Sequence, residues 1–538
     1  MNSVDPATSL HQTLTATARS FAGDQGIEPS MDVPPKAELG DYSSNAAMLM
    51  AKGLGRAPRD IAVELADRLS TELTGTVERI EVAGPGFINL FLCDGWYRTV
   101  VQDLVFSETA VVPPSDRPES ILVEFVSANP TGPLTAASGR HAAYGDSLAR
   151  LLREAGHRVT TEYYVNDGGT QIQNFALSIA ARMLGNEPPE NGYHGDYVNE
   201  LAQRAKAEGI EPDDLPELSK SSVEWMVSAI RSSLERFGVG MDDFFSERSL
   251  YERNLVETGL ERLKATGHTE QREGALWLKT TDFGDDKDRV LVRTGGEPTY
   301  FGADVAYHAD KVGRGYSRLI DVLGADHHGY VSRMAAAIQC MERPVQFEAQ
   351  LMQMVHLVEG GERTKMSKRA GDIVTLDELL DDIGADATRF FMLQRSHDST
   401  MDLDLDLARS QSSDNPVYYV QYAHARIQSI LRKAGRSGPA SPDLLPQIPV
   451  DPSEKALIAK LLAFPSEVHG AATRRSPHRI CAYATQTAAA FHAFYRDCQV
   501  IGADGEGVES VRLDLCEATA ATIRRSLGLL GISAPEQM

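Results

Sequence analysis

The stretch GGERTKMSKRAGD, residues 360–372, gathers basic side chains at a spacing suited to chemistry. Lys365, Lys368 and Arg369 fall within five residues, with Met366 and Ser367 between the two lysines. Charge-assisted donors of this kind bind phosphates and stabilise the negative charge that develops in phosphoryl or nucleotidyl transfer. The pattern therefore predicts a loop that closes over a nucleoside triphosphate. Judged by charge alone, it would be an ordinary solvated basic loop.

A second group of candidate residues surrounds the end of the apolar run ILVEFVS. Glu124 lies inside this run, and a carboxylate there either points into a site or needs a buried partner, because a lone buried charge is costly. Ser127 and Asn129 follow at the edge where α/β sheets bind ligands. Gly132 lets the backbone approach a ligand closely, and a helix expected to begin near Thr135 would offer free N–H groups to an anion.

The elements that must position these residues follow a strand–helix–strand order. The run ILVEFVS is nearly all apolar, as in parallel strands buried on both faces. Leucines 148, 151 and 152 form one helical stripe, and RVTTEYYVND at residues 158–167 reads as the next strand. A second strand-to-loop signal is RLIDVLGADHHGY, residues 318–330. These units predict a doubly wound α/β domain of Rossmann type, and the mostly helical, acidic stretch 168–270 is expected to be an insertion.

Two further domains are expected on either side. In PRDIAVELADRLSTEL an apolar face recurs every four residues, and strand-like runs at 77–82 and 87–92 follow, which indicates an α+β domain. After about residue 405 helical periodicity dominates, in stretches at 415–435, 453–470, 476–499 and 507–530. We therefore expect domains at residues 1–112, 118–405 and 411–538, the last an all-α helical bundle.

Composition narrows the class of protein. The chain has 538 residues and a formal net charge of −23, which argues against a general polyanion binder but leaves room for local basic patches. No apolar run approaches the ~20 residues of a membrane span, and the N-terminus lacks a signal-peptide pattern, so we expect a cytoplasmic protein. Its five cysteines are scattered without a CxxC pair, and no metal site or disulfide framework is predicted.

Longer stretches resemble one family. KMSK behind a Rossmann-type domain resembles the second signature of class I aminoacyl-tRNA synthetases. Further stretches are similar to bacterial arginyl-tRNA synthetases and run in family order from about residue 40 to the C-terminus. They are GDYSSNAAMLMAKGLGRAPRDIA, VAGPGFINLFL, EFVSANPTGPL, YYVNDGGTQI, GALWLKTTDFGDDKDRVLVR, TYFGADVAYHADK, GADHHGY, KMSKRAGDIVTLDEL and NPVYYVQYAHARI.

This resemblance implies a reaction and its partners. L-Arginine and ATP would give arginyl-adenylate and pyrophosphate, and the arginyl group would pass to the 3′ end of tRNA(Arg), with bound tRNA typically needed for the first step. Mg²⁺ would accompany ATP, held mainly by phosphates and water, so no protein ligands are assigned. The first domain would contact tRNA and the helical bundle would bind the anticodon, with no membrane partner and the chain acting as a monomer.

The resemblance also implies roles for individual residues. A planar cation with five donors needs carboxylates and a phenol as acceptors, which suits the implied guanidinium site. Aromatic side chains of the helical domain would stack on anticodon bases, although core packing is an equal alternative for two of the tyrosines 418, 419 and 422. The implied arginine-binding residues are Glu124, Ser127, Asn129, Glu247, Tyr300, Asp304 and His328; the ATP-binding residues are Gly132, Ser138, His327, His328, Lys365, Met366 and Lys368; the catalytic residues are Lys365, Ser367, Lys368, Thr135 and Ser138; and the tRNA-binding residues are Tyr418, Tyr422 and Arg426.

One stretch departs from the family pattern. Residues 135–138 read Thr-Ala-Ala-Ser where the family carries its first signature, His-x-Gly-His. Loss of one preorganised donor costs about 10²–10³ in rate. Three interpretations stay open: compensation by the hydroxyls, the helix N-terminus and Arg140 or His141; an active but specialised paralogue; or a catalytically inactive binder of tRNA or arginine. A nucleotide-binding enzyme that acts on a small guanidino substrate without tRNA is a further alternative.

Overall fold

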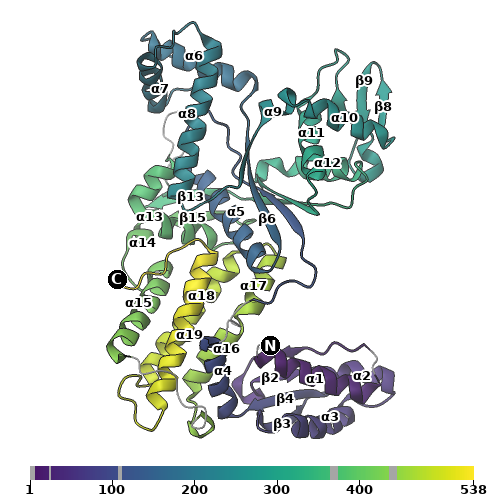
Figure 1. Ribbon diagram of the computed structural model, residues 1–538, viewed down its shortest axis with the longest axis vertical. Helices are drawn as coiled ribbons and strands as arrows, with labels where there is room; N and C mark the ends of the chain where they lie inside the picture. Colours follow the sequence, from purple (N-terminus) through teal and green to yellow (C-terminus); the bar gives the residue numbers. More distant parts are fainter. Residues whose placement is uncertain (1–5, 24–25, 107–111, 364–373, 436–444) are drawn as a thin grey trace.

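A computed structural model of the chain describes residues 6–23, 26–106, 112–363, 374–435 and 445–538. The N-terminal domain lies at one end, a central parallel sheet carries helices on both faces, and a helical bundle lies between them (Figure 1). Within the described part of the chain, no helix is both long and apolar enough to cross a bilayer. The three-part architecture expected from the sequence is confirmed.

The N-terminal domain is a four-stranded sheet of order β1-β2-β4-β3 with helices packed against it. Its predicted helix forms because Ile61, Leu65 and Leu69 recur on one face and are fully buried. The two predicted strands pair antiparallel. Its elements are α1 (Pro6–Ala22), β1 (Met31–Asp32), η1 (Ala37–Leu39), β2 (Tyr42–Ser44), α2 (Ala46–Leu54), α3 (Pro58–Glu72), β3 (Val77–Ala83), β4 (Phe87–Leu92) and α4 (Asp94–Phe106).

The catalytic sheet has five parallel strands in the order β12-β11-β5-β6-β7. The chain runs outward from β5 through β6 to β7 and then returns to β11 and β12 on the other side. The order therefore switches between β5 and β11, where open α/β sheets bind ligands, and the doubly wound prediction is confirmed. The strands and their first crossover helix are β5 (Ser120–Glu124), α5 (Ala136–Glu154), β6 (Arg158–Val165), β7 (Asp243–Ser246), β11 (Arg318–Gly324) and β12 (Gln346–Met352).

The stretch 168–270 is only in part the helical insertion that the sequence suggests. Residues 243–246 form β7, which pairs with β6 and belongs to the catalytic sheet, so the expectation is wrong for this segment. A strand of four residues that begins with an aspartate is too short to give a periodic signal. Three helices before it, α6 (Gly169–Met183), α7 (Asp196–Ala207) and α8 (Leu215–Arg236), share their own apolar cluster, and we call them the helical subdomain.

The chain between β7 and β12 packs at the ligand edge of the sheet, on the side away from the helical subdomain (Figure 1). Its helices share an apolar cluster with a small antiparallel sheet of order β10-β9-β8. The elements are α9 (Glu247–Glu252), α10 (Leu255–Ala265), β8 (Thr269–Arg272), β9 (Ala275–Leu278), η3 (Thr280–Phe283), β10 (Arg289–Val292), α11 (Tyr300–Gly313), η4 (Ala325–His327) and α12 (His328–Gln339).

The C-terminal region is helical, as predicted, with one difference. The stretch expected as a single helix at 453–470 is two helices, broken before Phe464 and Pro465, because proline is favoured at a helix start and disfavoured inside. A short sheet and two helices precede the bundle. The elements are β13 (Val355–Glu359), β14 (Glu362–Arg363), α13 (Leu376–Leu393), β15 (Met401–Asp404), α14 (Leu405–Arg409), α15 (Pro416–Ala434), η5 (Leu445–Gln447), α16 (Pro452–Leu462), α17 (Phe464–Thr473), α18 (His478–Asp497) and α19 (Val508–Leu529).

The bundle is joined to the N-terminal domain through α4. The guanidinium of Arg98 in α4 contacts the Glu454 carboxylate of α16 at 2.8 Å, and both side chains are completely buried. Lys455 and Asp94 form a second ion pair, at 2.9 Å, at the edge of the same contact.

Candidate active site

Predicted site residues meet at the carboxyl edge of the parallel sheet. β5 ends at Glu124, β7 ends one residue before Glu247, and β11 ends just before His327 and His328. Both histidines are exposed at this edge, and so is Asn129. The topology of the sheet therefore brings the ends of β5, β7 and β11 to the same edge.

The chain bends sharply after β5. Val126 and Ser127 have φ values of 68° and 40°, a region that β-branched residues rarely adopt, so the bend is strained. The Ser127 amide donates to the Phe125 carbonyl at 3.0 Å. The Ser127 hydroxyl accepts from the Tyr164 amide at 3.1 Å and donates to Glu124 at 2.9 Å. Ser127 thus links β5 to β6 and orients the Glu124 carboxylate.

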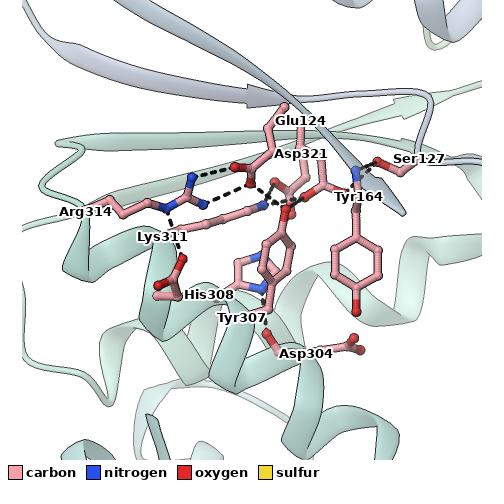
Figure 2. A network of polar contacts seen from close by, with 11 residues as sticks. Glu124, Ser127, Tyr164, Asp304, Tyr307, His308, Lys311, Arg314 and Asp321 are labelled. Atoms are coloured by element: carbon pink, nitrogen blue, oxygen red, sulfur yellow. Dashed lines mark hydrogen bonds and ion pairs between the residues drawn. The ribbon is translucent and has the colours of Figure 1, made fainter. Parts of the chain in front are cut away.

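Glu124 belongs to a buried group in which each carboxylate has a cationic partner. The Lys311 ammonium donates to Glu124 at 2.5 Å and to Asp321 at 3.0 Å. The Tyr307 hydroxyl lies 2.9 Å from Glu124 and 2.6 Å from Glu162, and its single proton serves one of them at a time. Figure 2 shows these groups converging from β5, α11 and β11. We call Glu124, Glu162, Tyr307, Lys311, Arg314 and Asp321 the paired network.

The paired network keeps Lys311 and Glu162 charged. Burial alone would lower the pKa of Lys311, but Asp321 and Glu124 outweigh burial and the pKa is raised. Burial would likewise raise the pKa of Glu162, yet Arg314 and Lys311 hold it below its ordinary value. One of the two alternatives expected for Glu124 was an ion pair with a buried partner, and Lys311 is that partner.

Two further carboxylates next to this network lack a cation. Burial raises the pKa of Asp304 to about 6, with repulsion from Glu124 adding to the effect and His308 opposing it. Burial also raises the pKa of Glu247, and repulsion from Asp304 adds to it. The Tyr164 hydroxyl opposes this rise in the pKa of Glu247. Among the residues that the structure describes, neither carboxylate forms an ion pair, and we call Asp304 and Glu247 the acidic pair.

Tyr300 does not pack on the acidic pair. It is the first residue of α11 and its side chain is 80 % exposed. Tyr300 contributes to the raised pKa of Tyr251, which is caused first by burial and then by Glu247 and Asp304. The predicted phenol therefore lies at the rim, and Tyr164 supplies the phenol inside.

The Thr-Ala-Ala-Ser turn begins α5. The Thr135 hydroxyl caps the helix by accepting from the Ser138 amide at 3.2 Å, and the two hydroxyls lie 3.1 Å apart. The turn also pairs with the chain at Thr375: the Leu376 amide donates to the Leu134 carbonyl at 2.8 Å. Residues 374–376 directly follow the basic stretch; Lys365, Met366, Ser367 and Lys368 themselves lie outside the described residues.

Of the two side chains proposed to compensate for missing histidines, Arg140 is not available. It is buried and its guanidinium donates to the carbonyls of Gln353, Ser396 and Ser399 at 2.7–2.9 Å. His141 lies closer to the ligand edge, where it is influenced by Asp326 and His327. Burial lowers the pKa of His141 to about 4, so its imidazole is neutral at pH 7.

Sequence reasoning missed most of the paired network and Tyr164. One signal was present: Asp321 interrupts the apolar strand RLIDVLG. A second was the spacing of Asp304, Tyr307, Lys311 and Arg314, which places four polar groups on one helical face. Such a stripe usually marks a solvated surface, and only the fold shows that this one is covered by the sheet.

A separate hollow of about 820 Å³ lies in the helical bundle between α15 and α18. Tyr418 and Tyr422 line it with their rings stacked 6.1 Å apart at an angle of 10°. The Arg426 guanidinium lies over the rings of Tyr422 and Tyr495, at 5.3 and 5.0 Å. Tyr419 also lines the hollow but packs in part against the core.

Three family models match the chain in the order of its domains. Residues 7–92 match the arginyl tRNA synthetase N terminal domain, residues 199–427 match the catalytic domain of class I (R) tRNA synthetases, and residues 420–538 match the DALR anticodon binding domain.

Full-length relatives agree with these matches. The arginine–tRNA ligase of Desulforudis audaxviator is 46% identical over 555 residues and that of Shouchella clausii 44% over 526, covering 98% and 94% of both chains. The fold is similar to that of Thermus thermophilus arginyl-tRNA synthetase, with a TM-score of 0.77, 24% identity and coverage of 99% of this chain and 100% of that one. The chain therefore belongs to the arginyl-tRNA synthetase family of class I aminoacyl-tRNA synthetases, which are ligases.

Proposed function

We propose that the chain activates L-arginine with ATP to arginyl-adenylate and transfers the arginyl group to the 3′ end of tRNA(Arg). The observation that carries this proposal is the acidic pair: two carboxylates without a cation, at the ligand edge of the sheet, with the Tyr164 hydroxyl beside them. A guanidinium would supply the missing charge and donate to all three groups. An uncharged analogue would leave the carboxylates unpaired, so discrimination needs no editing domain.

Arginine-dependent exchange of pyrophosphate into ATP, with and without cognate tRNA, tests this proposal. We expect exchange with arginine and tRNA and none above background with citrulline, which replaces the guanidinium by a neutral urea group. Exchange that is equally fast with citrulline would contradict the assignment of the acidic pair. Full activity on free arginine with no tRNA binding would instead favour a guanidino-substrate enzyme that does not use tRNA.

We propose further that Thr135–Ser138 occupies the place of the first class I signature and that the side chains of this turn and the α5 N-terminus act at the ATP phosphates. Thr135 is also the helix cap, so its replacement mixes two effects. Ala137→Gly with Ser138→His restores most of the family pattern and leaves the cap intact. A large rise in exchange rate would show that the native turn is impaired, and no change or a fall would support compensation.

Thr135→Ser and Thr135→Ala separate the cap from the chemistry. Serine keeps the capping oxygen, whereas alanine removes it at a cost of about 1 kcal/mol in the free energy of unfolding. If alanine lowers the exchange rate and serine does not, while the alanine protein remains folded at the assay temperature, the hydroxyl acts in the reaction or positions the helix start.

A second candidate function is a specialised or catalytically impaired paralogue that binds tRNA or arginine. It is favoured by one observation, that residues 135–138 carry no imidazole. Its signature would be measurable tRNA binding with no pyrophosphate exchange under any condition.

We propose that Tyr418, Tyr422 and Arg426 bind unstacked anticodon bases in the hollow of the helical bundle. Stacking on an aromatic ring contributes about 1–3 kcal/mol per base, so Tyr422→Ala should raise the KM for tRNA about tenfold and leave the KM for arginine unchanged. Tyr422→Phe keeps the ring and is the matched control. Equal KM values for tRNA in parent and alanine proteins would exclude Tyr422 from the interface.

The remaining expectations are carried forward as proposals. We propose that Mg²⁺ accompanies ATP without protein ligands, that Asn129, His327 and His328 contact arginine and adenosine, and that Lys365, Met366, Ser367 and Lys368 act on the phosphates. We propose domain limits at 1–112, 118–405 and 411–538, a monomer, and a cytoplasmic location. Chelation of divalent ions should stop the exchange, and sedimentation equilibrium should give the mass of one chain.

A further inference from the structure

Two tyrosine hydroxyls hold the turn between β5 and α5 from opposite sides. The Tyr163 hydroxyl donates to the Ala128 carbonyl at 2.7 Å, and the Tyr197 hydroxyl donates to the Thr131 carbonyl at 2.8 Å. Tyr163 belongs to β6 and is buried in the catalytic domain. Tyr197 belongs to α7 of the helical subdomain, which lies beyond the ligand edge of the sheet (Figure 1).

Gly132 shows how closely the subdomain approaches the turn. A Cβ on Gly132 would stand 3.1 Å from the Tyr197 hydroxyl oxygen and 3.2 Å from its Cζ atom, tighter than nine in ten real Cβ contacts. A side chain at this position would therefore press on Tyr197, and glycine avoids that contact. The ring of Tyr197 also packs against Phe175 of α6, with 6.3 Å between centroids, so its position follows the core of the subdomain.

A shift of the Thr131 carbonyl would change the positions of the residues on either side of it in the turn. The Thr131 amide donates to the Asn129 carbonyl at 2.8 Å, which closes a tight turn, and the α5 cap at Thr135 follows four residues later. A displacement at Thr131 is therefore transmitted to Asn129 on one side and to the start of α5 on the other.

We propose that Tyr197 is a positioning residue through which the helical subdomain sets the geometry of the nucleotide-binding turn. It touches neither substrate nor reacting atoms and acts through Thr131 and Gly132. The expected effect of Tyr197 on kcat rests on the proposed function. The effect of Tyr197 on the geometry of the turn can be measured without any reaction.

The direct test is Tyr197→Phe, which removes the hydroxyl and keeps the ring in the subdomain core. The kcat of arginine-dependent pyrophosphate exchange should fall about fivefold, the effect of losing one neutral hydrogen bond. The arginine Kd should change less than kcat, since Asp304 and Glu247 lie off the turn and Asn129 is the proposed arginine contact on it. Tyr193→Phe removes a hydroxyl from the same cluster, where the Tyr193 ring lies 5.3 Å from Phe175, and is the matched control.

Hydrogen exchange of backbone amides separates positioning from a general loss of structure. In the unliganded Tyr197→Phe protein, peptides covering 128–135 should exchange faster, whereas peptides from α6 and α8 should match the parent. Tyr193→Phe should show neither change. Faster exchange spread over the whole subdomain, or an unchanged turn with an unchanged kcat, would overturn the proposal.

Gly132→Ala provides an independent variant. Its methyl group would push on the Tyr197 hydroxyl, so its effect on the turn should be smaller in the Tyr197→Phe background than in the parent. Strict additivity of the two changes, in amide exchange and in kcat, would contradict a shared contact. If the parent protein catalyses no exchange at all, the proposed function fails, while the amide measurements still decide the role of Tyr197.

Discussion

Two groups of carboxylates lie next to each other at the ligand edge of the sheet, and they differ in whether their negative charges have cationic partners. In the paired network, Glu124, Glu162 and Asp321 each contact Lys311 or Arg314, so every carboxylate has a cationic partner inside the protein. In the acidic pair, Asp304 and Glu247 are buried enough to have raised pKa values and have no cation within the described chain. The first group holds the site together, and the second leaves a negative charge for a ligand to neutralise.

The comparison teaches how to tell scaffold from site when both consist of acidic residues. A raised pKa signals an unmet demand for positive charge, whereas a lowered pKa signals a demand already met. Glu124, placed in the arginine site by resemblance, is bound by Lys311 in the structure, and any contact with substrate would be shared with that lysine.

Breaking the paired network should give the largest effect. Lys311→Met leaves Glu124 and Asp321 buried without their cation, and we expect a loss of about 3–5 kcal/mol in the free energy of unfolding. Urea denaturation at pH 7.5 measures it. Lys264→Met, which removes an exposed ammonium from an i,i+3 pair with Glu261, should cost less than about 0.5 kcal/mol. A loss below about 1 kcal/mol for Lys311→Met would mean that the network does not depend on this charge.

Neutralising the acidic pair should affect binding and spare the fold. Asp304→Asn should weaken arginine binding about 30- to 100-fold, since it removes a charged acceptor from the guanidinium site. Isothermal titration with arginine measures it. Asp310→Asn changes the same group on the same helix, where Asp310 pairs with Arg314 at 3.1 Å, and should leave the arginine Kd within twofold. Equal effects of the two variants would remove Asp304 from the site.

The titration of Asp304 should make arginine binding depend on pH. Its pKa of about 6 means that the carboxylate is mostly protonated at pH 5 and mostly ionised at pH 7, so the association constant should rise about tenfold over this range. The stability contribution has the opposite sign. Because the folded pKa lies above the unfolded value, the folded chain binds an extra proton between about pH 4 and 6, and stability falls as the pH rises through this window.

Asp304→Asn tests the pH dependence of arginine binding and the pH dependence of stability together. The variant should lose the pH dependence of arginine binding, and at pH 7.5 it should melt at a higher temperature than the parent because an unpaired buried charge is gone. A pH profile that is the same in parent and variant would assign the titration to another group.

The smallest effects should come from replacing Tyr164 and Tyr307, which lie at the acidic pair and in the paired network, respectively. Tyr164→Phe removes the hydroxyl that opposes the raised pKa of Glu247 and should weaken arginine binding about threefold to tenfold with little change in unfolding free energy. Tyr307→Phe removes the donor to Glu124 and Glu162 and should do the reverse, lowering stability and sparing affinity. If both variants change the same quantity, the division into two groups is wrong.

The fold was predictable where local pattern and burial agree. The apolar run before Glu124 and the stripe at Leu148, Leu151 and Leu152 predicted the first strand and crossover helix, and the structure confirms both. β7 was not predictable, because four residues carry no period and its place depends on pairing with β6. The division of one helical stretch into two was signalled by Pro465, since proline is disfavoured inside a helix and favoured at its start.

The site was predictable only where residues follow strand ends. Glu247, His327 and His328 lie where the topology of a parallel sheet brings loops together, and a sequence can indicate such positions. The pairing of Lys311 with Glu124 joins residues far apart in the chain through a helix packed on a sheet, and no local pattern encodes it. The exposed position of Tyr300 also depends on how α11 is packed.

The fully buried pair of Arg98 and Glu454 has a mechanical consequence for the whole molecule. Separating its partners would leave the buried guanidinium of Arg98 without its carboxylate, so α4 and α16 cannot slide past each other at low energetic cost. The N-terminal domain and the helical bundle are therefore held at a fixed separation through this contact. A ligand long enough to reach both domains would meet them at that separation.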